Sequence, residues 1–285
     1  MTTPLERLRA RRLTLGAPLC LGIDPHPDRL PTGMPRGVAG IESFARGVIE
    51  AAVDHAAAVK VNAAFFEAFG SAGWAALERI RRDVPRDVLF ILDAKRGDID
   101  TTAERYAAGI FGTLGADAVT LSPYLGEDAI IPFLAHADRI VYVLVRTSNP
   151  SGGRLQELIV EGEPVHQRVA RWVTATWRDG RVGLVVGATA PQELALLRAT
   201  LPGPAFLVPG VGAQGGDLAA SARACDGDWA PGVVSVSRGI AGASIGEDWR
   251  EAAAAAARAL RSRLQEAVLH SEATAAQRPT TEARD

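Results

Sequence analysis

The chain has 285 residues and a mass of 30.0 kDa, with 47% hydrophobic and 22% charged residues, a composition typical of globular proteins. This composition excludes a disordered, fibrous or disulfide-rich chain, and no apolar run approaches the ~20 residues that cross a bilayer. The formal net charge of −2 gives no electrostatic reason to expect a nucleic acid or a membrane as partner. The amino terminus, MTTPLERLRARR, is too charged for a signal peptide, so we expect a cytoplasmic protein with a small ligand.

Lysine is unusually rare in this chain. Of the 31 Lys and Arg residues, only Lys60 and Lys95 are lysines. Lysine is a compact ammonium that can give up its proton, whereas the guanidinium of arginine is planar and stays protonated. Chance is one explanation for the two lysines. The other is a site where arginine would fail.

Neither the cysteines nor the histidines predict a metal site. Cys20 and Cys225 lie far apart without a CxxC spacing, which favours two buried free thiols over a zinc site or a disulfide. The histidines show no metal-ligand spacing; they are His26, His55, His136, His166 and His270. We therefore expect no metal in the functional site.

Eight short apolar segments recur along the chain, with helical patterns between them. They are residues 18–24, 58–62, 88–93, 117–122, 140–145, 182–188, 205–210 and 233–237. Near-continuous apolar runs of this length are typical of parallel strands that are covered on both faces. Eight alternations of strand and helix in ~250 residues predict a single (β/α)8 TIM barrel. A doubly wound open sheet is the alternative, although it usually has fewer repeats.

The flanking segments fit this barrel. Residues 1–17 predict a short helix over its bottom, and residues 247–268 predict its last helix, so the catalytic domain spans 1–268. Residues 269–285 are polar and lack apolar periodicity, which predicts a disordered tail. The longest irregular connection, 146–162, has the length of a lid or binding loop.

Polar side chains gather where the first three predicted strands end. Asp24 ends the first strand, Lys60 and Asn62 lie on the second, and Asp93 and Lys95 end the third. Barrel enzymes carry their functional groups at this end of the strands, so both lysines fall in the predicted site. Alternation along a strand puts Lys60 and Asn62 on one face, and likewise Asp93 and Lys95. Solvated ion pairs are the alternative, but they would not explain why both lysines lie here.

A second polar cluster follows the seventh and eighth strands. The segment PGVGAQGG at 209–216 has glycines whose backbone N–H groups can surround an anion, and Arg238 directly follows the eighth strand. This is the usual place for a phosphate in a barrel enzyme, and arginine binds phosphate with two parallel hydrogen bonds. An ordinary glycine turn is the alternative.

The segment DAKRGDIDTT at 93–102 resembles the Asp-x-Lys-x-x-Asp-Ile signature of the orotidine 5′-phosphate decarboxylase family, with its following threonine. The resemblance covers nearly the whole barrel and is closest to the long bacterial form. It is carried by LGIDP at 21–25, VKVN at 59–62, LSPYLG at 121–126, TSNPSG at 147–152, VVGATAP at 185–191, PGVGAQGGD at 209–217 and SRGI at 237–240.

The resemblance implies loss of carbon dioxide from orotidine 5′-phosphate to give uridine 5′-phosphate (UMP), in pyrimidine biosynthesis and without a cofactor. Lys95 would protonate C6 of the pyrimidine. Lys60, Asp93, Lys95 and Asp98 would form a network of alternating charge. Asp98 and Thr102 would reach the active site of the neighbouring subunit, which implies a homodimer with shared sites.

The resemblance also implies the remaining substrate contacts. Asp24 would bind ribose hydroxyls, and Asn62 belongs to the same group of substrate-binding residues. Ser148 would read the pyrimidine edge, although the adjacent Thr147 competes for that role. The phosphate end is assigned to Gly212, Gln214, Ser237 and Arg238, with Gln214 bridging the pyrimidine and the phosphate.

Two other functions stay open. Magnesium-dependent phosphosugar decarboxylases and synthases share the Asp-x-Lys-x-x-Asp element, but Lys60 at the end of its strand is a poor neighbour for a dication. A non-catalytic nucleotide-binding barrel could keep the phosphate loop, but the intact pair of lysines speaks against it.

Overall fold

The computed structural model describes residues 2–212 and 215–276. Within them, eight parallel strands close into a barrel in the order β1-β10-β9-β8-β5-β4-β3-β2, which confirms the predicted (β/α)8 fold. The barrel strands are β1 (Leu19–Ile23), β2 (Ala58–Asn62), β3 (Leu89–Arg96), β4 (Ala118–Leu121), β5 (Ile140–Arg146), β8 (Val182–Val186), β9 (Phe206–Pro209) and β10 (Val233–Val236).

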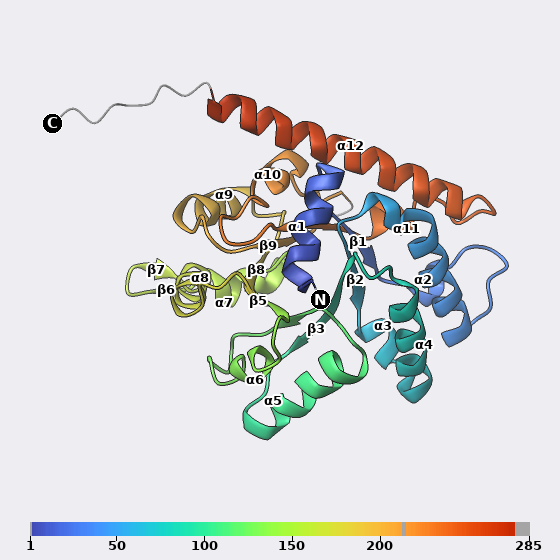
Figure 1. The fold of residues 1–285 in the computed structure, drawn as a ribbon, viewed down its shortest axis with the longest axis horizontal. Helices are drawn as coiled ribbons and strands as arrows, with labels where there is room; N and C mark the ends of the chain where they lie inside the picture. The colour runs from blue at the N-terminus through green and yellow to red at the C-terminus, as the bar shows by residue number, and fades with distance from the viewer. Residues whose placement is uncertain (1, 213–214, 277–285) are drawn as a thin grey trace.

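Helices surround the barrel in the part of the chain described (Figure 1). They are α1 (Pro4–Leu15), α2 (Val38–Ala52), α3 (Ala64–Glu67), α4 (Gly70–Asp83), α5 (Asp100–Ala107), α6 (Ile131–Leu134), α7 (Gly153–Gln156), α8 (Val165–Thr176), α9 (Pro191–Thr200), α10 (Leu218–Arg223), α11 (Arg238–Ala241) and α12 (Trp249–Ala276). A π-helical turn at Ala108–Thr113 continues α5.

Alternation along each strand divides the core into two layers. On β2, Val59 and Val61 face the surrounding helices, whereas Ala58 belongs to a second apolar cluster inside the barrel. Lys60 lies two residues after Ala58 on the same strand, so its side chain also points into the barrel, one layer closer to the carboxyl ends of the strands than the apolar cluster. The lower barrel is therefore apolar, and polar side chains lie toward the carboxyl ends of the strands.

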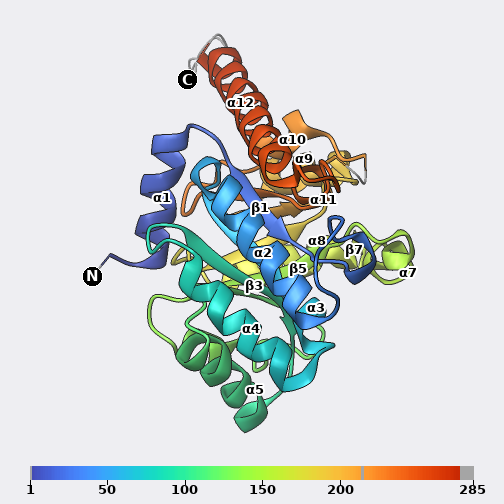
Figure 2. The same ribbon diagram turned by 90° about the vertical axis from the view of Figure 1, so that its right-hand side faces the viewer.

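The expected helix over the bottom of the barrel is present as α1. Thr3 and Glu6 form a reciprocal capping box at its start, which satisfies two backbone donors of the first turn. Leu8, fully buried, and Leu15 pack into the interior cluster. Figure 2 shows α1 at one end of the barrel and α7 at the other. The helix thus closes the end opposite the polar one.

Two expectations about the connections are wrong. Helix α12 continues to Ala276, eight residues beyond the expected boundary at 268, because LHSEATAA is rich in strong helix formers that need no apolar stripe to continue a helix. The rest of the expected tail, 277–285, lies outside the described residues. The connection 146–162 is not irregular: it contains α7 and the strand β6 (Ile159–Val160), which pairs with β7 (Glu163–Pro164).

Candidate active site

A cavity of about 100 Å³ lies at the carboxyl ends of the barrel strands. It is lined by residues that the sequence analysis singled out together with some that it missed: Asp24, Lys60, Ser148, Pro209, Gly210, Val211, Ser235, Ser237 and Arg238. Ser235, buried on β10, was missed, although it shares the interior face with Val233 two residues earlier. The first, second, fifth, seventh and eighth barrel strands thus meet at one polar pocket.

Both lysines bind one carboxylate beside this cavity. Lys60 Nζ donates to Asp93 Oδ2 and Lys95 Nζ donates to Asp93 Oδ1, each over 2.6 Å. The pairing of Asn62 with Asp93 in the β2–β3 ladder fixes the height of this array in the barrel. The side chain of Lys60 is 7% exposed and that of Lys95 is 50% exposed. Lys60 is therefore the buried anchor, and Lys95 keeps a face that a substrate can reach.

The charges of this array stabilise one another. Burial by itself would raise the pKa of Asp93, but the ammonium groups of Lys60 and Lys95 outweigh it and hold that pKa well below its ordinary value. Burial would likewise lower the pKa of Lys60, but the carboxylates of Asp93 and Asp24 raise it above its ordinary value. At neutral pH, Asp93 is therefore a carboxylate and Lys60 an ammonium ion.

Thr120 on β4 shapes the end of β3, and the sequence analysis missed it. Its hydroxyl donates to Asp93 Oδ1 over 2.9 Å and accepts from the backbone N–H groups of Ala94 and Lys95. Lys95 has a φ of 46°, a left-handed conformation that costs a residue with a side chain about 1 kcal/mol or more. These hydrogen bonds hold the turn that directs Lys95 back onto Asp93. The sequence signal was a single threonine within the apolar run AVTL of this strand.

Asp24 and Asn62 flank the array differently. Asp24 lines the cavity, and its buried Oδ1 has no hydrogen-bond partner within the described chain, which leaves it free to accept from a ligand. Asn62 Oδ1 instead accepts from the backbone N–H of Ala64, at the start of α3.

Gly22 permits the close approach of β1 to Ser237, since a Cβ there would lie 2.8 Å from the Ser237 Cβ.

The loop after β5 separates Ser148 from Thr147. Thr147 Oγ1 donates to Asn149 Oδ1 over 2.5 Å and accepts from Gln156 Nε2 over 2.8 Å, so its hydroxyl is used within the loop. Ser148 lines the cavity. Gly187 leaves room for this arrangement, because a Cβ there would lie 3.1 Å from the Ser148 backbone nitrogen. The geometry favours Ser148 over Thr147 as the residue that meets a ligand.

The glycine-rich loop closes on itself above the cavity. The N–H of Gly216 donates to the carbonyl of Gly210, and the N–H of Gly215 donates to the carbonyl of Gly212. Gly212 is exposed and has a φ of 83°, which a residue with a side chain rarely adopts. Arg238, the first residue of α11, lines the cavity with no side-chain partner among the described residues. Gln214 lies outside the described residues.

Asp98 and Thr102 do not join the cavity in one chain. Asp98 Oδ1 accepts from the backbone N–H of Ile99, and Thr102 is exposed on α5. The charge network within one chain therefore consists of Lys60, Asp93 and Lys95. Over residues 2–212 and 215–276, no group of three or more His, Cys, Asp or Glu side chains is arranged to hold a metal ion.

Comparison with known proteins assigns the family. The family described as "Orotidine 5′-phosphate decarboxylase / HUMPS family" matches residues 17–256, which include every barrel strand. The chain belongs to this family. The orotidine 5′-phosphate decarboxylase of Roseiflexus castenholzii is 51% identical over 253 residues, which are 88% of this chain and 93% of that protein. That of Herpetosiphon aurantiacus is 44% identical over 257 residues, 90% and 95% of the two chains.

Solved structures agree with the family. The Leishmania donovani OMP decarboxylase is 38% identical, with a TM-score of 0.82 over 94% of this chain and 99% of that one. The resemblance inferred from DAKRGDIDTT is thereby confirmed at the level of the orotidine 5′-phosphate decarboxylase family.

Proposed function

We propose that this chain decarboxylates orotidine 5′-phosphate to UMP and carbon dioxide, a step of pyrimidine biosynthesis, and that Lys95 protonates C6 of the pyrimidine. The relatives named above are orotidine 5′-phosphate decarboxylases, and they support the reaction. The observation that carries the mechanism is the Lys60–Asp93–Lys95 array, which lies beside a cavity whose lining includes an unpaired arginine.

The chemistry requires electrostatic stabilisation of a carbanion. The carboxylate leaves from C6, where no carbonyl is placed to accept the electron pair, so a vinyl carbanion develops there. A positioned ammonium stabilises this charge in the transition state and then donates its proton to C6. Lys95 fits both roles because half of its side chain is exposed at the site and because, unlike arginine, it can give up a proton.

Asp93 positions Lys95 and faces the departing carboxylate. Like charges ~4 Å apart repel by about 4 kcal/mol at an effective dielectric of 20, so its charge also disfavours the bound substrate. The larger share of the rate enhancement belongs to carbanion stabilisation, because Asp93 already binds two ammonium groups that offset its charge. No step of this mechanism uses a cofactor or a metal ion.

The rest of the site recognises the two ends of the substrate. The unpaired Oδ1 of Asp24 is suited to accept from a ribose hydroxyl, and Ser148 is suited to read the pyrimidine edge. At the other end, Ser237, Arg238 and the backbone of Gly212 would hold the phosphate. Gln214 would bridge the phosphate and the pyrimidine, and Asn62 would complete the wall beside Asp93.

A homodimer would complete each site with Asp98 and Thr102 of the partner subunit. Large apolar side chains near these residues are exposed: Ile99 (47%), Tyr106 (40%), Tyr124 (82%), Leu125 (47%) and Ile131 (52%). Such a group of exposed apolar side chains is typical of a protein interface. An isologous dimer on this face would bury these side chains and place Asp98 of each chain at the cavity of its partner.

A cytoplasmic location is part of the proposal. Cys20 and Cys225 are both free and buried, and burial raises the pKa of each thiol to about 12. Buried unpaired thiols suit a reducing compartment. Within the described residues, no helix is long and apolar enough to cross a membrane.

The test follows the ultraviolet absorbance change when purified protein is mixed with orotidine 5′-phosphate, with and without a metal chelator. We expect turnover that resists the chelator. Lys95→Ala should lower kcat by ~10³-fold or more, and Lys95→Arg should not restore it because arginine keeps the charge but does not release the proton.

Near-normal turnover by folded Lys95→Ala would contradict the mechanism. Turnover that the chelator abolishes would instead favour a metal-dependent member of the same family. Circular dichroism of both variants checks that the fold is intact.

A further inference from the structure

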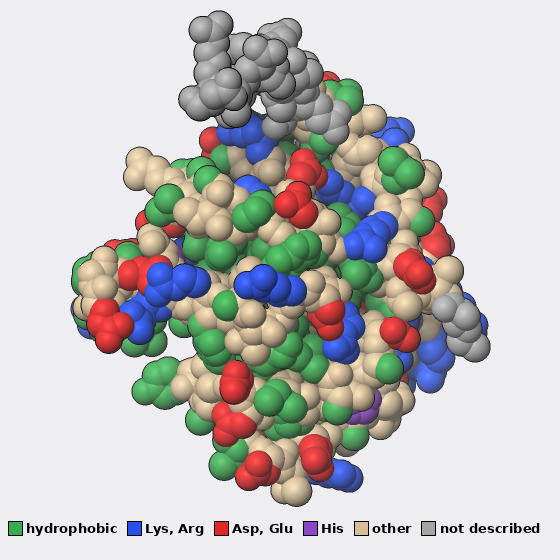
Figure 3. Space-filling view, turned by 60° about the vertical axis from the view of Figure 1, so that its left-hand side comes forward, with side chains coloured by type: hydrophobic (Ala, Val, Ile, Leu, Met, Phe, Trp, Pro, Cys, Tyr) green, Lys and Arg blue, Asp and Glu red, His purple; other side chains and the backbone are tan. Residues whose placement is uncertain are grey.

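A second polar cavity lies at the amino-terminal end of the barrel, beside α1 and opposite the candidate active site. Its volume is about 740 Å³. Five arginines and two aspartates line it: Arg7, Arg81, Arg82, Arg86, Arg139, Asp117 and Asp138. Figure 3 shows acidic and basic side chains interspersed over one face of the molecule, whereas arginines outnumber acidic residues in the lining of this cavity. Positive charge is thus concentrated at this cavity although the net charge of the chain is −2.

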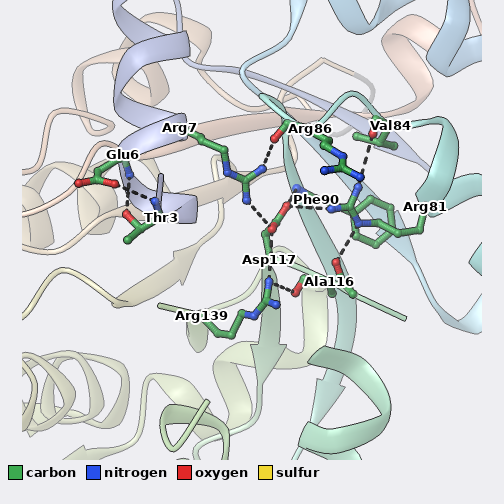
Figure 4. A network of polar contacts seen from close by, with 11 residues as sticks. Thr3, Glu6, Arg7, Arg81, Val84, Arg86, Phe90, Ala116, Asp117 and Arg139 are labelled. Atoms are coloured by element: carbon green, nitrogen blue, oxygen red, sulfur yellow. Dashed lines mark hydrogen bonds and ion pairs between the residues drawn. The ribbon is translucent and has the colours of Figure 1, made fainter. Parts of the chain in front are cut away.

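One buried carboxylate organises the arginines (Figure 4). Asp117, directly before β4, accepts from Arg7 over 2.5 Å and from Arg81 and Arg139 over 3.5 Å each. Its Oδ2 also accepts from the backbone N–H of Phe90 over 3.0 Å. The side chain of Asp117 is only 3% exposed. All of its acceptor capacity is therefore used, and it offsets one positive charge.

The remaining positive charge is not neutralised by ion pairs among the described residues, since Asp138, the second acidic residue of the lining, forms none there. Neither Arg82 nor Arg86 forms a side-chain hydrogen bond or ion pair within residues 2–212 and 215–276. Burial lowers the pKa of Arg81, Asp117 opposes this effect, and the nearby Arg7, Arg139 and Arg86 lower it further. Because guanidinium groups stay protonated, this repulsion persists at physiological pH unless an anion enters the cavity.

We propose that this cavity binds a compact polyphosphate, either free or as the tail of a nucleotide. Guanidinium groups bind phosphate oxygens with paired, charge-assisted hydrogen bonds, and several around one cavity favour a multiply charged ligand over a single carboxylate. Thr2, Thr3 and Pro4, at the start of α1, form one wall of the cavity. None of the described lining residues is aromatic, so the phosphates and not a stacked base carry the recognition.

A polyphosphate here would link three elements that meet only at this end of the barrel. Arg7 belongs to α1, Arg82 to the end of α4, and Arg139 precedes β5. A ligand that binds the native state alone stabilises it by mass action, so binding should raise the thermal unfolding temperature. The alternative is that the cluster only anchors α1 through Asp117.

Arg82 and Arg86 distinguish polyphosphate binding from simple anchoring of α1, because neither of them contacts Asp117. Calorimetric titration with inorganic triphosphate, at about 50 mM salt to limit screening, is made on Arg238→Ala so that the candidate active site does not contribute. We expect one equivalent bound per chain. Adding Arg82→Gln and Arg86→Gln should weaken binding by about tenfold or more, because two charge-assisted contacts are lost.

A control with the same charge change carries Arg223→Gln and Arg263→Gln, two exposed positions on α10 and α12 away from the cavity. We expect its binding to be unchanged. A parallel titration with ATP identifies the source: equal affinity means that the phosphates alone are recognised, and tighter binding means a nucleotide. Absence of binding, unchanged binding in the Arg82/Arg86 variant, or equal weakening in the control would each overturn the proposal.

Discussion

Asp93 has the most polar contacts in the Lys60–Asp93–Lys95 array, since it accepts from two ammonium groups and one hydroxyl. Removing its charge would leave Lys60 buried beside a neutral group. Breaking a buried ion pair in this way typically costs about 3–5 kcal/mol, because the remaining charge is uncompensated. Asp93 therefore stabilises the fold, in addition to the catalytic role proposed for it.

We expect Asp93→Asn to lower the free energy of unfolding at pH 7 by about 3–5 kcal/mol and to change its pH dependence. The folded-state pKa of Asp93 lies below its unfolded value of about 3.9, so its stabilisation is present above that pH and is lost as the pH falls toward the folded value. Urea unfolding from pH 7 to pH 3 should therefore show a smaller decline for the variant than for the wild type.

A matched control is Asp87→Asn, whose carboxylate is 66% exposed in its pair with Arg11. This substitution should lower the free energy of unfolding by less than about 1 kcal/mol, as is usual for surface ion pairs. Equal pH dependence in wild type and Asp93→Asn would show that Asp93 does not have the lowered pKa.

Arg238 lines the cavity together with Lys60, and its guanidinium has no partner within the described chain. We expect Arg238→Ala to raise KM for orotidine 5′-phosphate by ~10–100-fold, because a bidentate phosphate contact is lost. With the dephosphorylated nucleoside as substrate, the substitution should raise KM by a smaller factor. Steady-state kinetics on both compounds measure the difference, and Arg263→Ala on α12 is the control. An equal increase in KM with both compounds would rule out a phosphate contact.

At the scale of elements, the apolar runs predicted all eight barrel strands, because strands covered on both faces need continuous apolar sequence. Apolar periodicity did not predict every element outside the barrel. Helix α12 extends past 268 through helix propensity alone, which leaves no periodic signal. Helix α7 and the β6–β7 hairpin are short elements held by side-chain contacts such as that of Arg146 with Glu157, which spacing does not reveal.

Helix α1 offers a test of how its end of the barrel contributes to stability. Leu8 is fully buried in the interior cluster, whereas Leu13 on the same helix is 86% exposed. Leu8→Ala should lower the free energy of unfolding by about 2–5 kcal/mol, and Leu13→Ala by less than about 0.5 kcal/mol. Below the unfolding transition, kcat and KM should match the wild type for both. A small effect of Leu8→Ala would show that α1 does not close the barrel.

At the scale of the whole molecule, sequence reasoning was strongest where chemistry restricts the residue type. The scarcity of lysine indicated Lys60 and Lys95, and the structure brings both onto Asp93. Thr120 could not be singled out, because its role depends on the register between β3 and β4, which is irregular there. Asp98 illustrates a second limit: its motif position marks it as functional, but one chain does not bring it to the cavity.

A homodimer with shared sites makes a quantitative prediction. Each complete site would combine Lys95 of one chain with Asp98 of its partner, so Lys95→Ala and Asp98→Ala should each be inactive as pure proteins. When they are mixed in equal amounts under conditions that allow subunit exchange, half of the dimers become hybrids. One of the two sites in a hybrid carries both substitutions and the other carries neither. Activity should therefore recover to about a quarter of the wild-type value, provided that the dimer is two-fold symmetric. The readout is turnover of orotidine 5′-phosphate before and after exchange, with Lys95→Ala mixed with Lys95→Ala/Asp98→Ala as the control that cannot form an intact site. No recovery, with hybrid dimers verified by native mass spectrometry, would mean that Asp98 acts within its own chain.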